Sequence, residues 1–367
     1  MKPLEILVPR WADAQNSNPQ NLNAVALLSR FARPEAKWRT FFYDSPAPGV
    51  AVSRSVGMVK LWRRRLWKYH VAALYQSSVD AIFYPGVEWE DKLGLNLRRI
   101  SGRKIPLIAT MESLVGDERR EAELSEPAGH PVHCARVKPE TLQWIDSLYR
   151  SADLIIAISP FLARMGSHLY GPRFRTQMLG LDSAFCPSTS NFPNSRPLVL
   201  NLASFQERKR PELFVELAAK FPQADFAWYG SGSRLEEFRR SAQSRGLSNL
   251  RFPGAVRHDE LPALMNSADI FVLPSNSEGV PKVTQEAAAC GLAVVIFGFY
   301  ESPSVVHEKN GYVVWNDAEL FDAVGRLIAD RELREQMGAA GATMAKEWNW
   351  DLRAPQWENE VLGFLGR

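Results

Sequence analysis

The chain has 367 residues, a hydrophobic fraction of 46%, a charged fraction of 23% and a formal net charge of +3. These values describe a globular protein that is long enough for two domains of about 100–200 residues each. A charge this close to neutral argues against a nucleic-acid binder, which usually carries a strong and clustered basic bias. We therefore expect no nucleic-acid partner.

Cysteine usage and hydropathy indicate the compartment. Cys134, Cys186 and Cys290 are odd in number and form neither a CxxC pair nor a metal-ligand spacing, which predicts reduced thiols. The N-terminal segment MKPLEILVPRW has too short an apolar stretch for a signal peptide. The longest apolar run, Leu292–Phe299, is far below the roughly 20 residues of a spanning helix. We expect a cytoplasmic protein, with any membrane contact peripheral and at the inner face.

Short apolar runs alternate with amphipathic segments in two blocks, which is the pattern of repeated βαβ units. In the first block we expect buried parallel strands at Glu5–Val8, Arg39–Tyr43, Ala81–Tyr84, Pro106–Thr110 and Leu154–Ile158. In the second block we expect strands at Leu198–Leu202, Asp225–Tyr229, Leu250–Phe252, Ile270–Leu273 and Ala293–Ile296. Helices are predicted at Pro211–Lys220, Arg234–Ser244 and Glu260–Ser267. The predicted class is α/β, with two doubly wound domains.

Polar segments mark the domain boundaries. Cys186–Pro197 is dense in Pro, Ser and Asn and predicts a linker, whereas Asp117–Pro139 predicts a loop or a short irregular insertion. Trp348–Leu365 is amphipathic and predicts a closing helix. We therefore divide the chain into a first domain of residues 1–187, a second domain of residues 188–347, and a C-terminal helix, 348–367, that packs back on the first domain.

Two carboxylates bracket the start of a predicted helix in the second block. A buried strand is followed by a polar turn with Glu278, and a helix begins near Pro281 and carries Glu286 about one and a half turns inside. Free amides at a helix start, with the helix dipole, form an anion site. These amides belong to Gly279, Val280, Lys282 and Val283. The two carboxylates would then accept hydroxyl groups on either side of a diphosphate; the alternative is that both are solvated helix-face residues.

This strand, turn and helix resemble those of the retaining glycosyltransferases with two Rossmann-like domains (GT-B), family 4 (group 1) in particular. The family's E-x7-E hallmark runs from Glu278 to Glu286 and is followed by AAACG. The resemblance implies that Glu278 contacts the donor sugar as a catalytic residue and that Glu286 binds the ribose hydroxyls. It also implies an acceptor-side first domain and a nucleotide-sugar-binding second domain that face each other across a cleft.

Leu202–Ala218 resembles the phosphate-binding strand, loop and helix of this family. The resemblance assigns Lys209 to the donor phosphates, while the family's second cation falls on Ser204. Arg208 or Arg210 would then have to supply that charge. The alternative is that these basic residues form a solvated helix start.

Three further stretches extend the resemblance. WYGSGSRLEEF matches a strand and turn in which Gly230 and Gly232 would allow close approach of the donor. A lone GxG is weak evidence for a dinucleotide site. Phe252–Ser275 resembles the stretch that helps to hold the base, and Leu179–Pro187 resembles the interdomain hinge.

The first block resembles the family less closely. The loop Trp11–Ala24 is rich in Asn and lacks Gly, so Asn21 is our candidate for the acceptor side. Where the family often has a His, this chain has Met111 and Glu112. We consider Glu112 as an acceptor-side or catalytic carboxylate, and a structural loop residue is the alternative.

Val59–Tyr75 interleaves basic and aromatic side chains, among them Arg63, Arg64 and Trp67. Such a helix suits an anionic membrane surface or an anionic acceptor such as a lipid-linked diphosphate. The alternative is a surface helix whose Trp side chains dock on the core.

The sequence contains no D-x-D, the usual metal–diphosphate signature of the other main glycosyltransferase fold. We therefore expect no metal and no cofactor, with cationic side chains and helix-start amides neutralising a UDP- or GDP-linked donor. The predicted reaction is retaining transfer of a sugar to a glycan, lipid-linked or small-molecule acceptor, as in polysaccharide biosynthesis. The alternatives are a catalytically silent nucleotide-sugar-binding protein and a nucleotide-sugar epimerase on the same fold.

Overall fold

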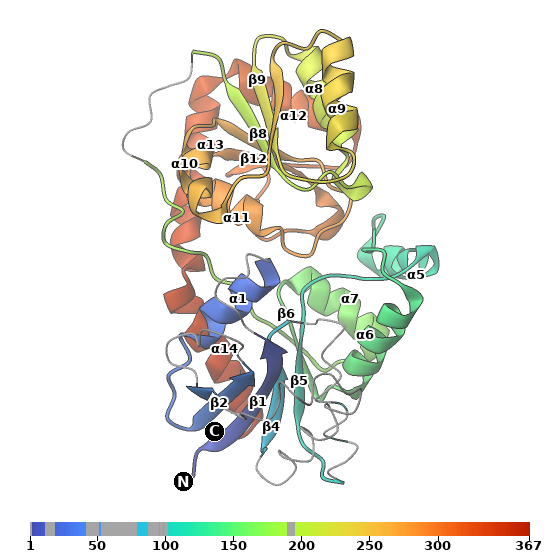
Figure 1. Cartoon of the computed structure of the whole chain (residues 1–367), viewed down its shortest axis with the longest axis vertical. Coiled ribbons are helices and arrows are strands. Elements are labelled where there is room, and N and C mark those ends of the chain that lie inside the picture. The colour runs from blue at the N-terminus through green and yellow to red at the C-terminus, as the bar shows by residue number, and fades with distance from the viewer. Residues whose placement is uncertain are drawn as a thin grey trace, which may run out of the picture. The chain divides into compact units, whose positions relative to one another are not determined.

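The computed structural model describes residues 2–11, 19–41, 51–52, 79–86, 95, 98, 102–188 and 195–367. The chain forms two compact units (Figure 1). Unit 1 contains Met1–Asp117, Arg136–Gly180 and Trp350–Arg367, and unit 2 contains Glu118–Ala135 and Leu181–Asn349. The chain thus passes between the units four times, after residues 117, 135, 180 and 349. This division differs from the predicted contiguous first domain of residues 1–187, because residues 118–135 and 181–187 group with the second unit.

Unit 1 is a parallel sheet with helices. Its strands are β1 (Leu4–Trp11), β2 (Ala36–Phe41), β3 (Ala51–Val52), β4 (Ala81–Tyr84), β5 (Leu107–Met111), β6 (Leu154–Ala157) and β7 (Phe174–Thr176). Its helices are α1 (Pro19–Leu28), α6 (Pro139–Ser151), α7 (Pro160–Tyr170) and α14 (Trp350–Phe364). The strand order is β3-β2-β1-β4-β5-β6-β7. Every residue of β4, β5 and β6 is buried, as expected for strands covered on both faces.

Helix α14 completes the core of unit 1 with two buried tryptophans, Trp350 and Trp357. The indole nitrogen of Trp357 donates to the carbonyl of Met178 at 2.8 Å. The buried Glu358 accepts hydrogen bonds from the backbone of Ala32 and from the Trp38 indole. The last helix of the chain therefore packs within the unit that also contains the first strand.

Unit 2 is a second parallel sheet. Its strands are β8 (Leu198–Leu202), β9 (Asp225–Tyr229), β10 (Leu250–Gly254), β11 (Ile270–Leu273), β12 (Ala293–Phe297) and β13 (Gly311–Val314). Its helices are α5 (Glu118–Ala128), η1 (Glu207–Lys209), α8 (Pro211–Lys220), α9 (Leu235–Ser244), η2 (His258–Glu260), α10 (Leu261–Asn266), α11 (Lys282–Ala289), η3 (Gly298–Tyr300), α12 (Asp317–Ala329), α13 (Arg331–Ala345) and η4 (Lys346–Trp348). The strand order β10-β9-β8-β11-β12-β13 reverses between β8 and β11. At such a reversal the loops diverge, so ligands bind there, at the carboxyl ends of the strands.

The predicted class, α/β with two doubly wound Rossmann-like units, is confirmed. The strands β4, β8, β9 and β11 have the bounds predicted from the sequence. The prediction of a loop or irregular insertion at Asp117–Pro139 is wrong in part, because this segment contains α5. Only Leu124 of α5 is buried, so its sequence carries almost no apolar periodicity to indicate a helix.

Candidate functional site

The predicted donor residues of unit 2 gather where the strand order reverses. Lys209 ends η1, which follows β8, and Glu278 lies in the turn after β11. The two strands are also joined by the side chain of Asn201, whose Nδ2 donates to the carbonyl of Val272 at 2.5 Å. The fold therefore brings together two segments about seventy residues apart in the sequence, at the edge where parallel sheets bind ligands.

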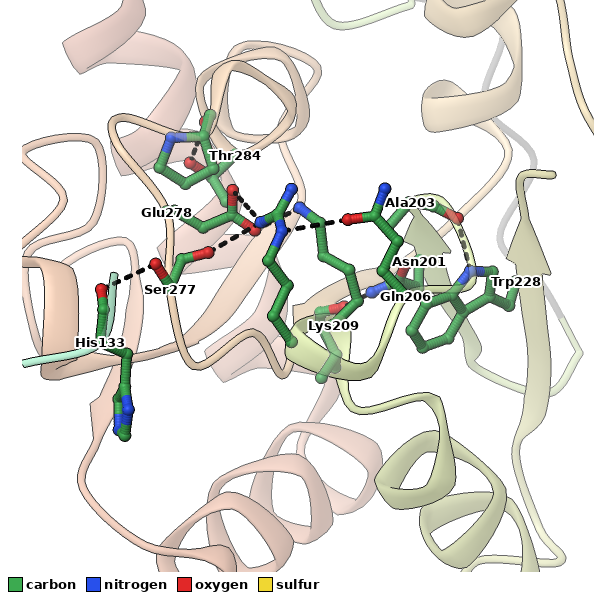
Figure 2. A network of polar contacts seen from close by, with 12 residues as sticks. His133, Asn201, Ala203, Gln206, Lys209, Trp228, Ser277, Glu278 and Thr284 are labelled. Atoms are coloured by element: carbon green, nitrogen blue, oxygen red, sulfur yellow. Dashed lines mark hydrogen bonds and ion pairs between the residues drawn. The ribbon is translucent and has the colours of Figure 1, made fainter. Parts of the chain in front are cut away.

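Glu278 is held by two cations, one of which, Lys209, is labelled in Figure 2. The Lys209 ammonium forms an ion pair with Oε1 of Glu278, and Arg208 lies 3.2 Å from Oε2. The side chains of Lys209 and Glu278 are 11% and 10% exposed. Arg208 also donates to the carbonyl of Ser277 at 2.8 Å, and its own carbonyl accepts from the Asn276 amide at 2.9 Å. The turn after β11 is thus fixed to η1 through both side chains and backbone.

Opposite charges set the ionisation of this cluster. Burial alone raises the pKa of Glu278, but Lys209 and Arg208 lower it by more, so its pKa lies below the usual range. Burial lowers the pKa of Lys209, and the Glu278 carboxylate opposes that effect. Glu278 is therefore a carboxylate at neutral pH, with a cation on each oxygen.

The structure distinguishes between the two arginines that could replace the missing cation at Ser204. Arg208 contacts Glu278, whereas Arg210 forms an ion pair with Asp317 at 2.8 Å. The guanidinium of Arg210 also lies over the ring of Phe297, 5.2 Å from its centroid. Arg208 is consequently the arginine that shares Glu278 with Lys209, whereas Arg210 is paired with Asp317.

Gly230 and Gly232 have a structural reason for being glycines. A Cβ on Gly230 would lie 1.9 Å from the carbonyl oxygen of Ala203, and one on Gly232 would lie 3.0 Å from the amide nitrogen of Phe205. Both residues have φ near +150°, which favours glycine. The prediction was that these glycines allow the donor to approach closely. In the structure it is the backbone of the loop after β8 that approaches them. These glycines thus place the loop that leads to Lys209.

Helix α11 begins as predicted, one residue after Pro281, and ends before Gly291, which has φ +85°. Pro281 is the N-cap and provides no side-chain cap. Within the described part of the chain, no backbone acceptor is found for the amides of Gly279, Val280 and Val283. Together with Lys282, these groups form the positive end of the helix.

Glu286 lies on the second turn of α11 and is 5% exposed. Burial raises the pKa of its carboxyl group to about 7; the charge of Lys282 lowers it and that of Asp182 raises it. Among the described residues, no hydrogen bond or ion pair reaches this carboxylate. A carboxyl group this buried, with its pKa raised and no cation paired to it among the described residues, is a strong candidate for contact with a ligand.

The predicted residues outside unit 2 remain predictions. Glu112 follows β5 and is half-buried in unit 1, and Asn21 lies in α1, where its side chain is outside the description. The basic residues Arg63 and Arg64 and the neighbouring Trp67 lie outside the described residues. No helix in the described ranges has the length and apolar character needed to cross a bilayer.

Sequence reasoning missed other features of unit 2. A hollow of about 830 Å³ between β13 and α12 is lined by Tyr312, Trp315 and Arg326, and it contains none of the predicted site residues. Ser277 and His133 were not singled out, although a hydrogen bond joins them beside Glu278. No local signal could have indicated that bond, because 144 residues separate its partners. As far as the chain is described, no three His, Cys, Asp or Glu side chains are grouped to hold a metal ion.

Comparison with known proteins agrees with this geometry. Residues 185–344, which lie within unit 2, match the family model of the glycosyl transferases group 1. The chain is 30% identical to the sulfoquinovosyl transferase SQD2 of Arabidopsis thaliana over 53% of its own length and 38% of that protein. It is 32% identical to a GDP-mannose-dependent phosphatidylinositol monomannoside mannosyltransferase of Mycobacterium tuberculosis, over 46% and 48%. The match thus spans about half or less of these relatives.

Solved structures extend the similarity to the whole fold. Sucrose-phosphate synthase of Thermosynechococcus elongatus superposes with a TM-score of 0.76 at 19% identity, covering 99% of both chains. Anabaena HepE, solved with UDP and glucose, superposes with a TM-score of 0.75 at 18% identity, covering 98% of this chain and 99% of that one. Both units therefore have the GT-B architecture.

Proposed function

We propose that this protein is a retaining glycosyltransferase that moves a sugar from a nucleoside-diphosphate donor to a glycan, lipid-linked or small-molecule acceptor. The observation that carries the proposal is the buried cluster of Lys209, Arg208 and Glu278 at the reversal of the unit 2 sheet. The buried Glu286 lies on the helix that starts beside it. Cation, amide and carboxylate are the groups that diphosphate and sugar hydroxyls require.

The proposed reaction is written on these residues. The bond between the anomeric carbon and the diphosphate oxygen breaks, and the negative charge on the leaving group is stabilised by Lys209, Arg208 and the amides of Gly279 and Val280. The acceptor hydroxyl attacks the anomeric carbon on the same face, and its proton passes to the leaving phosphate. Glu278 would accept a hydroxyl of the donor sugar, and Glu286 would accept the ribose hydroxyls. In this scheme no metal is needed, because protein groups supply the positive charge.

The known relatives support a nucleotide-sugar donor and suggest acceptors to try. HepE was solved with UDP-glucose, and the mycobacterial relative is a GDP-mannose-dependent enzyme acting on a phosphatidylinositol mannoside. A streptococcal relative makes a galactosylglucosyldiacylglycerol. We therefore propose a lipid-linked or glycan acceptor for this chain, with UDP- and GDP-sugars both as donors to be tested.

A panel of UDP- and GDP-sugars, labelled in the sugar, tests the proposal. We expect one donor to give transfer to a glycan or glycolipid acceptor, or slow donor hydrolysis without one, with EDTA leaving the rate unchanged. Proton NMR of the product should show the anomeric configuration of the donor. Tight nucleotide-sugar binding without turnover on any acceptor would favour the silent binding protein, and conversion of the donor sugar to its epimer would favour the epimerase.

A further inference from the structure

The loop that follows α5, residues 129–134, packs in a different unit from the segments that flank α5 and the loop in the sequence. It belongs to unit 2, although the chain up to Asp117 and again from Arg136 belongs to unit 1. It also lies outside residues 185–344, the range that matches the glycosyltransferase family model. We call residues 129–134 the α5 loop.

The α5 loop contacts the turn that carries Glu278. The hydroxyl of Ser277 donates to the carbonyl of His133 at 2.8 Å, and Ser277 is 6% exposed (Figure 2). The carbonyl of the same Ser277 accepts from Arg208 at 2.8 Å. Ser277 therefore joins the α5 loop on one side to the cation cluster on the other, one residue before the carboxylate.

Ring contacts fix the same loop to the segments that follow β12 and β13. The His133 ring lies edge-on to Phe299, 5.4 Å between centroids, and the His130 ring lies 5.1 Å from that of Trp315. His130 Nε2 is 3.0 Å from Oε1 of Glu301. Glu301 has a left-handed backbone, with φ +41°, which is an uncommon and unfavourable conformation for a residue with a Cβ. Three separate contacts thus hold the α5 loop on unit 2.

Helix α5 in turn holds the loop. The carboxylate of Glu121 accepts from the Cys134 amide at 2.7 Å, and the hydroxyl of Ser125 accepts from the Val132 amide at 3.0 Å. Both side chains lie on α5, so the backbone of the loop is fixed to the helix at two points. The His133 carbonyl is thereby presented to Ser277 in a defined position.

We propose that the α5 loop is a positioning element, and that Ser277 and His130 are positioning residues that fix the turn of residues 276–279 and so aim the carboxylate of Glu278. The effect on the rate of transfer rests on the proposed function, whereas the fixing of the turn by the loop does not. Loss of these contacts would let Glu278 adopt several positions and lower the rate of transfer. We expect nucleotide affinity to change less than the rate, because no hydrogen bond joins the described residues of the loop to Glu286 or to the amides of Val280 and Val283.

Ser277→Ala in the full chain tests the inference, with Ser244→Ala as the matched control. Ser244→Ala removes the same hydroxyl, which among the described residues bonds to the Ser241 carbonyl within α9. Hydrogen exchange by mass spectrometry, without substrate, should show faster exchange in residues 129–134 and 276–279 of Ser277→Ala and no change in the control. With the donor found active, kcat should fall about 3- to 10-fold, as expected for one hydrogen bond, with the KM for the donor within twofold.

His130→Phe provides a second variant should Ser277→Ala fail to fold. It retains a ring beside Trp315 and removes the hydrogen bond to Glu301, so the same two segments should exchange faster. Unchanged exchange in both segments, in whichever of these variants folds, would overturn the inference. The exchange experiment needs no activity, so absence of transfer in the unmodified protein would count against the proposed function alone.

Discussion

Burial of Glu286 gives the free protein a carboxyl group that titrates near neutral pH. Its folded pKa of about 7 lies above the ordinary value of 4.5. A carboxyl group whose pKa is raised by folding stabilises the folded state fully below pH 4.5, and this contribution is lost as the pH rises through 7. The shift corresponds to about 3 kcal/mol at most.

Glu286→Gln should therefore increase stability at high pH. We expect the free energy of unfolding to rise by up to about 3 kcal/mol relative to wild type at pH 8 and to change little at pH 4.5. Urea unfolding of both proteins at the two pH values measures this difference. Glu140→Gln, at an exposed position on α6, serves as the control. An equal effect of Glu286→Gln at both pH values would show that burial does not raise the pKa of this carboxyl group.

The two carboxylates should separate binding from transfer. Glu286→Ala is expected to weaken nucleoside diphosphate binding by about 10- to 100-fold, the range for a lost hydrogen bond to a charged group. Glu278→Ala is expected to impair sugar transfer with a smaller effect on that affinity. Calorimetric titration with UDP and GDP and rates with the active donor measure both. Equal affinity and equal activity in the two variants would place the pocket elsewhere.

The Lys209–Glu278 ion pair should show strong coupling in stability. Lys209→Met or Glu278→Leu alone leaves a buried charge without its main partner and should cost about 3–5 kcal/mol. The double variant removes both charges and should be less destabilised than the sum of the two single variants. Urea unfolding of the four proteins at pH 7 gives the coupling energy. Additive effects would mean that solvent already screens this pair.

At the level of elements, the turn after β9 depends on having no side chain at Gly230. Gly230→Ala should destabilise the protein by at least about 2 kcal/mol, because the methyl group would meet the Ala203 carbonyl and the backbone has φ +156°. It should also lower nucleotide affinity, since the displaced loop leads to Lys209. Thermal unfolding and nucleotide titration measure both effects.

Gly363→Ala is the matched control for that substitution. Gly363 lies in helix α14, and an added Cβ would meet nothing within 4 Å. Alanine should therefore leave stability unchanged or raise it by up to about 1 kcal/mol. Similar losses in both variants would show that the contact at Ala203 is not the cause.

Elements with strong local signals could be predicted from the sequence. The strand β11 is a continuous apolar run and β8 is apolar except for Asn201, and the Pro and Gly that bound α11 fix its ends. The resemblance of this region to group 1 glycosyltransferases is likewise confirmed. The local sequence pattern is sufficient for these elements. Each strand is recognised from its own apolar residues, and the order of strands in a parallel sheet then brings the loops after β8 and β11 together.

Features that depend on distant contacts could not be predicted. Helix α5 has one buried residue, so it lacks the stripe that indicates a helix. The choice of Arg208 over Arg210 depends on Asp317, more than one hundred residues later. The glycines at 230 and 232 were assigned to the donor because the sequence does not show the approach of another loop. The roles of Glu278 and Glu286 stay predictions.

At the scale of the whole molecule, two separate cores should unfold separately. We expect differential scanning calorimetry to resolve two transitions, or one broad transition whose calorimetric enthalpy exceeds the van't Hoff value. A nucleotide at 100 times its Kd should stabilise only unit 2, by about 2.7 kcal/mol. Hydrogen exchange then identifies the unit in which each transition occurs. An equal nucleotide-induced shift of both transitions would instead show that the units unfold together.

The position of residues 118–135 also constrains how this protein can be dissected or recombined. A fragment cloned from residue 181 to residue 349 would include the entire family-matched range and would still be structurally incomplete. It would leave the Ser277 hydroxyl without the His133 carbonyl, Phe299 without the His133 ring, and Trp315 without the His130 ring. A self-sufficient donor-binding fragment needs residues 118–135 spliced to it. Chimeras that exchange sequence halves between related enzymes should keep both pieces from one parent.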